Sequence, residues 1–249
     1  MIESSSDPAG YARLCPASLS PSAHGMDVTE EDHRPPVRLA VVILTKDEEA
    51  RIAGALESVA GISELVVVID SESTDQTREV AASLGAIVRT RAFDNFSAQR
   101  NFALDYVVEH FSPRWILALD ADERVTPALA AEIDDVTRKE PPEADAYLLP
   151  MRVTYSGRRL RYGGFGSMAY LRLFRPQSGR YEARGINEHF VLHGGVRIGR
   201  AKGVIEHEDI QSWSRHIAKH NNYSTLEAAA RATRKQIGAG TISLKMAFL

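Results

Sequence analysis

The sequence has a single cysteine, Cys15, among its 249 residues. One thiol can form neither an internal disulfide nor a thiolate metal cluster, so packing must hold the fold together, as suits a reducing compartment. Long apolar runs are also missing. The runs at 39–44 and 65–69 are far shorter than the roughly 18 residues of a membrane-spanning helix. No signal segment opens the chain. We therefore expect a soluble or peripheral protein of the cytoplasm.

The chain also lacks a strong excess of charge and two common nucleotide-binding motifs. Its formal charge is −3, from 30 basic and 33 acidic residues, so we expect no nucleic-acid partner. The first apolar run is followed by TKDEEA in place of the GxGxxG of dinucleotide-binding dehydrogenases. The stretch GGVRIGRAKG (194–203) lacks the Lys and Ser or Thr that complete a phosphate-binding loop. The sequence therefore excludes both a dinucleotide-binding dehydrogenase and a protein with a phosphate-binding loop of this type.

The chain is predicted to contain a leader and one domain. Residues 1–36 are rich in Ser, Pro, Ala and acidic residues and show no apolar periodicity, so we expect a disordered leader. The remaining residues, 37–249, are long enough for one sizeable core and form a single predicted domain.

Apolar runs of strand length alternate with helical stretches after the leader. The runs are LAVVIL (39–44), LVVVID (65–70), AIVRTR (86–91) and WILALD (115–120). This alternation predicts an α/β fold with a mostly parallel sheet, a Rossmann-like nucleotide-binding half over 37–141. One helix is expected to begin between Ser73 and Asp75 and to end at Gly85, and another to begin at Thr126–Pro127.

The second half, 142–249, has a different pattern. Strand-like pieces at 146–155 and 169–176 are separated by glycine-rich turns, which predicts a smaller, mixed sheet. A polar helix is expected over 213–234.

Polar residues follow three of the four apolar runs, at the sheet edge where open parallel sheets bind ligands. The sharpest set is Asp120-Ala121-Asp122, because side chains two apart on an extended chain share a face and can reach one hard divalent cation. Such a cation would neutralise charge on a diphosphate as a Lewis acid. The alternative is that these acids only cap the next helix.

Two further residues each have two alternative roles. Asp70 could cap a helix, or it could accept hydrogen bonds from the base or ribose of a nucleotide. Arg100 could be a solvated helix charge, or its guanidinium could lie near a nucleotide or diphosphate.

Four strings in this order and spacing resemble family 2 glycosyltransferases with the A-type fold: LAVVILTKDEEARI, LVVVIDSESTDQT, AQRNFAL and WILALDADERV. Within that family the chain is most similar to the bacterial lipopolysaccharide-core β-1,4-glucosyltransferase type. Three later strings, YLRLFR, INEHFVLHG and VIEHEDIQSWSRHIAKHNNYS, extend the resemblance to about residue 235. By this resemblance, the second half, residues 142–249, would bind the acceptor.

The resemblance also implies roles for particular residues. The nucleotide contacts would be Thr45, Asp47, Asp70, Arg100 and Asp120, and the metal ligands would be Asp120, Asp122 and His207. Glu188 would be the catalytic general base. A surface histidine remains the alternative for His207, and an ion-paired structural carboxylate remains the alternative for Glu188.

The reaction that the resemblance implies is an inverting transfer of glucose. The donor would be UDP-glucose, the cofactor Mn²⁺ or Mg²⁺, and the acceptor a hydroxyl of a lipopolysaccharide-core or other surface glycan or glycolipid, with a possible peripheral contact at the inner membrane. The alternatives are a nucleotidyltransferase or metal-dependent hydrolase on a similar fold, or a homologue that binds donor without turnover.

Overall fold

The computed structural model describes residues 37–162, 165–182 and 189–209, together with seven helical positions between 214 and 228. Those seven positions fall within the polar helix predicted for 213–234. The predicted leader, the rest of that helix and Glu188 lie outside the described residues.

Four parallel strands make up the first half of the sheet, as the apolar runs predict. They are β1 (Leu39–Thr45), β2 (Leu65–Asp70), β3 (Ile87–Thr90) and β4 (Trp115–Asp120), in the spatial order β3-β2-β1-β4. Central strands read as unbroken apolar runs because helices cover both of their faces. The run at 86–91 gives the shortest of these four strands, since β3 is the edge strand and its last two residues are exposed.

Four helices alternate with these strands: α1 (Ile52–Val59), α2 (Thr77–Ser83), α3 (Phe96–Phe111) and α4 (Pro127–Arg138). The start of α4 is as predicted, with the Thr126 hydroxyl accepting from the backbone N–H of Leu129 and proline in the first turn. Helix α2 begins slightly later than predicted, because Asp75 accepts from the N–H of Thr77 from outside the helix, at 3.0 Å.

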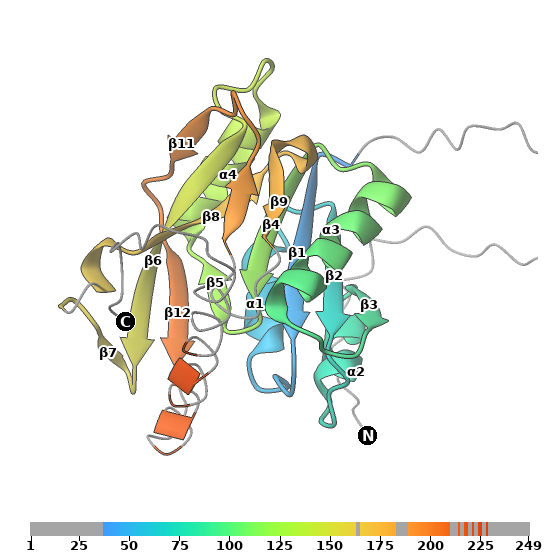
Figure 1. The fold of residues 1–249 in the computed structure, drawn as a ribbon, viewed down its shortest axis with the longest axis vertical. Coiled ribbons are helices and arrows are strands. Elements are labelled where there is room, and N and C mark those ends of the chain that lie inside the picture. The colour runs from blue at the N-terminus through green and yellow to red at the C-terminus, as the bar shows by residue number, and fades with distance from the viewer. Residues whose placement is uncertain are drawn as a thin grey trace, which may run out of the picture. The chain divides into compact units, whose positions relative to one another are not determined.

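The second half continues the same sheet. Strand β8 (Ala169–Phe174) pairs antiparallel with both β4 and β6 (Ala146–Tyr155), and β12 (Ile205–Asp209) lies between β6 and β5 (Glu123–Val125). The shorter elements are β7 (Arg158–Arg159), β9 (Gly179–Tyr181), β10 (Phe190–Leu192), β11 (Ile198–Arg200), and the 3₁₀ turns η1 (Phe165–Ser167) and η2 (Pro176–Ser178). Because β8 bridges β4 and β6, the two predicted halves share one sheet (Figure 1).

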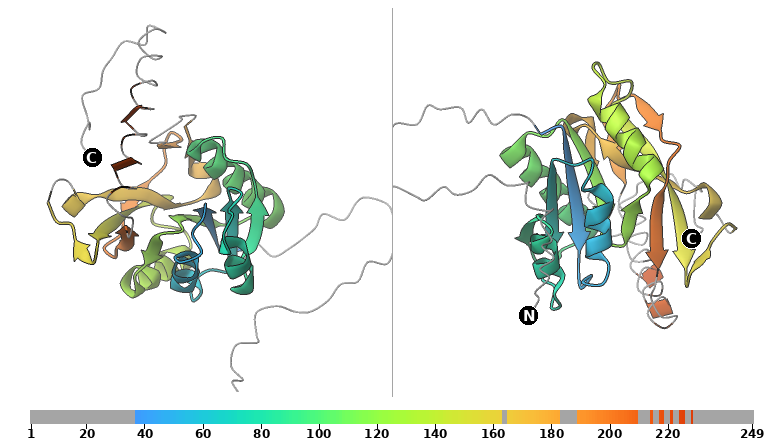
Figure 2. Two further views of the ribbon diagram at one scale, coloured as in Figure 1. Left: turned by 90° about the horizontal axis from the view of Figure 1, so that it is seen from below. Right: turned by 180° about the vertical axis from the view of Figure 1, so that it is seen from behind.

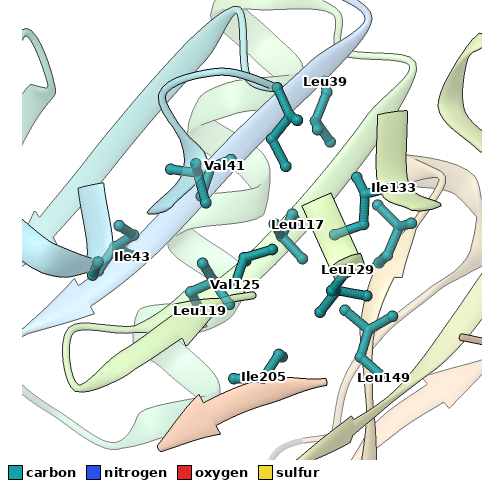
Figure 3. Packing of buried hydrophobic residues seen from close by; sticks show 14 of the residues in the cluster. Leu39, Val41, Ile43, Leu117, Leu119, Val125, Leu129, Ile133, Leu149 and Ile205 are labelled. Atoms are coloured by element: carbon teal, nitrogen blue, oxygen red, sulfur yellow. The ribbon is translucent and has the colours of Figure 1, made fainter. Parts of the chain in front are cut away.

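The core has two layers, one on each face of the sheet. Alternate residues of β1 and β4 pack with α1 and α4 on one face, as Figure 3 shows for Val41, Leu117 and Ile133. The intervening residues pack against α3 on the other face (Figure 2). This is the period-two alternation of a strand covered on both sides. None of the described helices combines the length and the apolar character needed to cross a membrane.

A close backbone approach between α4 and the turn that precedes β12 generates a stability prediction. A Cβ added at Gly203 would lie 2.5 Å from the Cα of Leu129, and neither backbone can move away freely. Gly203→Ala should therefore lower the free energy of unfolding by about 1–3 kcal/mol. Urea titration would measure this change. Gly61→Ala is the matched control, because nothing lies within 4 Å of its added Cβ. Equal midpoints for the two variants would contradict the predicted close packing.

Candidate functional site

A cavity of about 1050 Å³ opens at the carboxyl edge of the parallel strands. Its lining includes Thr45, Arg100, Asp120, Asp122, Arg172 and His207. Open α/β sheets bind ligands at this edge, and the ends of β1 and β4 both contribute to it. The cavity therefore brings together five of the eight predicted site residues, namely all in this list except Arg172.

A network of charged side chains lines this cavity at the turn between β4 and β5, with Arg100, Glu123 and Arg172 buried and Asp120 half-buried. Asp120 accepts from Arg100 Nη2 at 2.8 Å and from Arg172 Nη2 at 2.9 Å. The same Arg172 nitrogen donates to Glu123 Oε1 at 2.6 Å, and Glu123 Oε2 accepts from the backbone N–H of Asp120 at 2.9 Å. Arg172 comes from β8 and Arg100 from α3, so two distant elements fix the orientation of the acidic turn.

The two carboxyls of this network have opposite pKa shifts. Burial alone would raise the pKa of Asp120, but the charges of Arg100 and Arg172 outweigh it and hold that pKa well below its usual range. For Glu123, burial is also the largest effect, and Arg172 only partly offsets it. The nearby charges of Asp120 and Asp122 act in the same direction as burial and raise the pKa of Glu123 to about 7. Asp120 is thus the firmly ionised member of the pair.

Asp122 and His207 form a second pair beside this network. Strand β12 pairs antiparallel with β5, opposite Glu123, which brings His207 Nε2 to 3.1 Å from Asp122 Oδ2. Burial opposes the charged imidazole, but the hydrogen bond and the negative charge of Asp122 outweigh it and raise the pKa of His207. The contact joins the first half of the chain to the second.

The Asp122–His207 pair is compatible with a divalent cation. Within the described ranges, no cluster of three or more His, Cys, Asp and Glu residues could hold a metal ion. Mg²⁺ and similar ions, however, commonly take one or two protein ligands and complete their shell with substrate phosphates and water. The separation of 3.1 Å between the carboxylate oxygen and the imidazole nitrogen is close to the roughly 3 Å between adjacent ligands of an octahedral ion. Asp122 and His207 could therefore supply two ligands.

The remaining predicted residues differ in their surroundings. Thr45 is 4% exposed, and within the described structure its hydroxyl lines the cavity with no hydrogen-bond partner. Asp70 is fully buried, outside the cavity lining, and accepts from the N–H of Ser73 at 2.9 Å. Asp47 also lies outside the lining and accepts from the N–H of Thr74 at 2.7 Å. Asp47 and Asp70 therefore shape the loops after β1 and β2.

Arg172 is the main residue of the site that was not singled out from the sequence. The signal for it was present, because it is the only charged residue in the strand sequence AYLRLF. A charge in such a strand must find a buried partner, yet the identity of that partner depends on how β8 pairs with β4. The aromatic side chains of Phe93, Phe96 and Tyr170 in the cavity lining were also not predicted.

The buried network generates a prediction about stability. Arg172→Met should lower the free energy of unfolding by about 3–5 kcal/mol, because two carboxyls would lose their shared cation. Arg152→Met removes the same group from a partly exposed pair with Glu206 and should cost less than about 1 kcal/mol. Urea unfolding of both variants would measure the difference. A similar decrease in the free energy of unfolding in the two variants would mean that Arg172 stabilises the fold no more than a surface ion pair does.

Comparisons with known proteins agree with this architecture. A lipopolysaccharide core biosynthesis glycosyltransferase, LpsC of Rhizobium meliloti, is 29% identical over 204 residues, covering 78% of this chain and 72% of that protein. An uncharacterized glycosyltransferase of Rickettsia typhi, RT0209, is 36% identical over 121 residues, or 48% of this chain. The match spans only 40% of the length of the Rickettsia protein.

A solved structure also shares the fold. The mannosyltransferase PcManGT of Pyrobaculum calidifontis aligns with a TM-score of 0.52 at 17% identity, covering 83% of this chain and 66% of that one. The predicted A-type fold is thus confirmed. The model of the family described as "Glycosyl transferase family 2" matches residues 40–200, and the chain accordingly belongs to glycosyl transferase family 2.

Proposed function

We propose that this protein is an inverting glycosyltransferase that moves glucose from UDP-glucose to a hydroxyl of a lipopolysaccharide-core or other surface glycan, in the cytoplasm. The observation that carries the proposal is the Asp122–His207 pair, held at 3.1 Å beside two arginines at the ligand-binding edge of the sheet. Family membership supports transferase chemistry. The name of the LpsC relative supports the class of acceptor.

The nucleotide would bind at the ends of β1 and β2. The buried hydroxyl of Thr45 has an unused hydrogen-bonding capacity in the described structure, which a ribose or base could satisfy. Arg100 lies on the cavity wall and could turn its guanidinium toward a phosphate. We propose that Asp47 and Asp70 contribute by fixing the two loops that border the nucleotide, through their bonds to Thr74 and Ser73.

The diphosphate would lie over the acidic turn. Asp122 and His207 would hold a Mn²⁺ or Mg²⁺ ion, which would supply charge neutralisation to the departing diphosphate. PcManGT was solved with GDP-Man and Mn²⁺, which supports this type of donor and ion. Asp120 could join as a ligand where the diphosphate competes for one of its two arginines, since phosphate and carboxylate bind a guanidinium in the same bidentate way.

Transfer itself would be a single displacement. The acceptor oxygen forms a bond to the anomeric carbon while the bond from that carbon to the diphosphate oxygen breaks, and the electron pair leaves with the diphosphate. A sugar hydroxyl is a poor nucleophile at neutral pH, so its proton passes to a carboxylate during attack. We assign that role to Glu188, from the resemblance of the INEH segment. Attack from the face opposite the diphosphate inverts the anomeric configuration.

Product analysis with sugar nucleotides would test the function directly. Incubation with UDP-glucose, Mn²⁺ and a core oligosaccharide should release UDP and yield a glucosylated acceptor. A hydrolase would release free glucose without acceptor, a nucleotidyltransferase would release or consume pyrophosphate, and an inactive donor-binding homologue would release nothing. Any of these three results would overturn the proposal.

The metal site generates the next prediction. Asp122→Asn should weaken Mn²⁺-dependent UDP binding by at least about tenfold, because an amide is a weaker ligand than a carboxylate and loses the charge that attracts the cation. Thermal shift with UDP, with and without Mn²⁺, would measure this, because a ligand of the native state raises its stability. The control is Asp135→Asn, on the exposed side of α4. Unchanged Mn²⁺ dependence in a folded Asp122 variant would place the cation elsewhere.

The general base generates a kinetic prediction. Glu188→Gln should bind UDP and Mn²⁺ normally, while transfer falls by about 10²–10⁴-fold, because an amide cannot accept the proton. Single-turnover transfer assays would separate the two steps. The same substitution at Glu182 and at Glu206 provides matched controls. Full activity in the Glu188 variant would move the base to one of these two residues, and an α-linked product would rule out inversion.

A further inference from the structure

The middle of the second half has an unusual concentration of positive charge. Residues 146–181 contain seven arginines and no Asp, Glu or Lys, although the whole chain has a formal charge of −3. The carboxylates that could neutralise these arginines must therefore come from other segments.

Three of the seven arginines pair with carboxylates from elsewhere in the chain. Arg152 donates to Glu206 at 2.8 Å, Arg172 donates to Asp120 at 2.9 Å, and Arg180 donates to Asp105 at 2.7 Å. Each of these pairs joins two segments of the fold, so these arginines have structural roles.

Arg158, Arg159 and Arg161 differ from those three. Arg158 and Arg159 form β7, which the turn at 156–157 connects to the end of β6. Arg161 follows two residues after β7, and all three arginines are exposed. Among the residues that the structure describes, no carboxylate forms an ion pair with any of them. We call residues 156–162 the arginine hairpin. It carries three positive charges and no negative one.

The geometry of the arginine hairpin suits an extended anionic surface better than a small anion. Arg158 and Arg159 are consecutive strand residues, so their side chains leave opposite faces of the hairpin and cannot converge on one phosphate. Tyr162 is 88% exposed, and tyrosine favours membrane–water interfaces, where its ring and its hydroxyl meet different environments.

The arginine hairpin also lies at the edge of the sheet where the cavity opens. Strand β4 is antiparallel to β8, which is antiparallel to β6, so β6 runs in the same direction as β1 and β4. Its carboxyl end, which leads into β7 in Figure 1, is thus on the same edge as the carboxyl ends of β1 and β4. A planar surface that contacts the hairpin would lie at the edge with the cavity.

We propose that the arginine hairpin docks this protein onto anionic phospholipid headgroups, with the cavity opening at the membrane-facing edge. Guanidinium groups bind phosphate oxygens in a bidentate manner, and each basic residue near an anionic bilayer strengthens binding by about fivefold. Three arginines would then contribute roughly a hundredfold. The inference does not rest on the proposed transfer reaction, because docking requires neither donor nor acceptor.

Vesicle flotation with the full chain would test the proposal. Wild-type protein should float with vesicles of phosphatidylcholine and phosphatidylglycerol at low salt. It should remain unbound with pure phosphatidylcholine or at high salt, because salt screens exposed charges. The triple variant R158Q/R159Q/R161Q should bind the anionic vesicles roughly a hundredfold more weakly. Circular dichroism and the UDP thermal shift should match the wild type, since the hairpin is exposed.

The control for net charge is the triple variant R114Q/R138Q/R200Q. It removes the same charge from three other exposed arginines, of which Arg114 and Arg138 pair with Glu140 and Asp134. Arg114 directly precedes β4, and Arg200 pairs near the beginning of β6. This variant should float like the wild type. An equal loss of vesicle binding in both triple variants would mean that the net charge of the protein, and not the arginine hairpin, drives binding, which would overturn the proposal. Failure of the wild type to float would also overturn the proposal. So would binding of a soluble phosphorylated oligosaccharide through the same arginines without vesicle binding.

Discussion

The site depends on one guanidinium that two carboxyls share. Arg172 donates to both Asp120 and Glu123, and with Arg100 it compensates the negative charge that the acidic turn concentrates below the cavity. A buried carboxylate without a partner is costly, so the turn keeps this conformation only while β8 lies beside β4. The pairing of β4 with β8 also joins the two halves of the chain, so the acidic turn and the junction of the halves depend on the same strand contact.

Much of the first half could be predicted because its signals are local. Runs such as 39–44 and 115–120 are apolar throughout, since both faces of each strand are covered. Thr126 and Pro127 mark the start of α4 through capping chemistry that involves only neighbouring residues. The convergence of Thr45, Asp120 and Asp122 also followed from sequence, because parallel strands present their carboxyl ends at one edge.

The features that sequence could not provide depend on contacts between distant segments. Arg172 reaches Asp120 across 52 positions, and this pairing follows from the register of β8, which no local pattern specifies. The sequence offers two roles for Asp70, a helix cap or a nucleotide ligand, and its full burial and its bond to the N–H of Ser73 are contacts that no local pattern specifies. The pairing of the three-residue strand β5 with β12 also could not be predicted from the sequence, since neither segment alone indicates its partner.

The position of β12 between β5 and β6 has a consequence for how such a protein can diverge. The pairing of Ile205 with both Met151 and Val125 sets the register of His207, and side chains of a strand alternate between faces. An insertion of one residue within β12 would turn the imidazole away from Asp122. Extra residues in the turn at 156–157 would instead leave that register untouched. Evolution can therefore change the length and the charge of this hairpin while the Asp122–His207 pair remains in place.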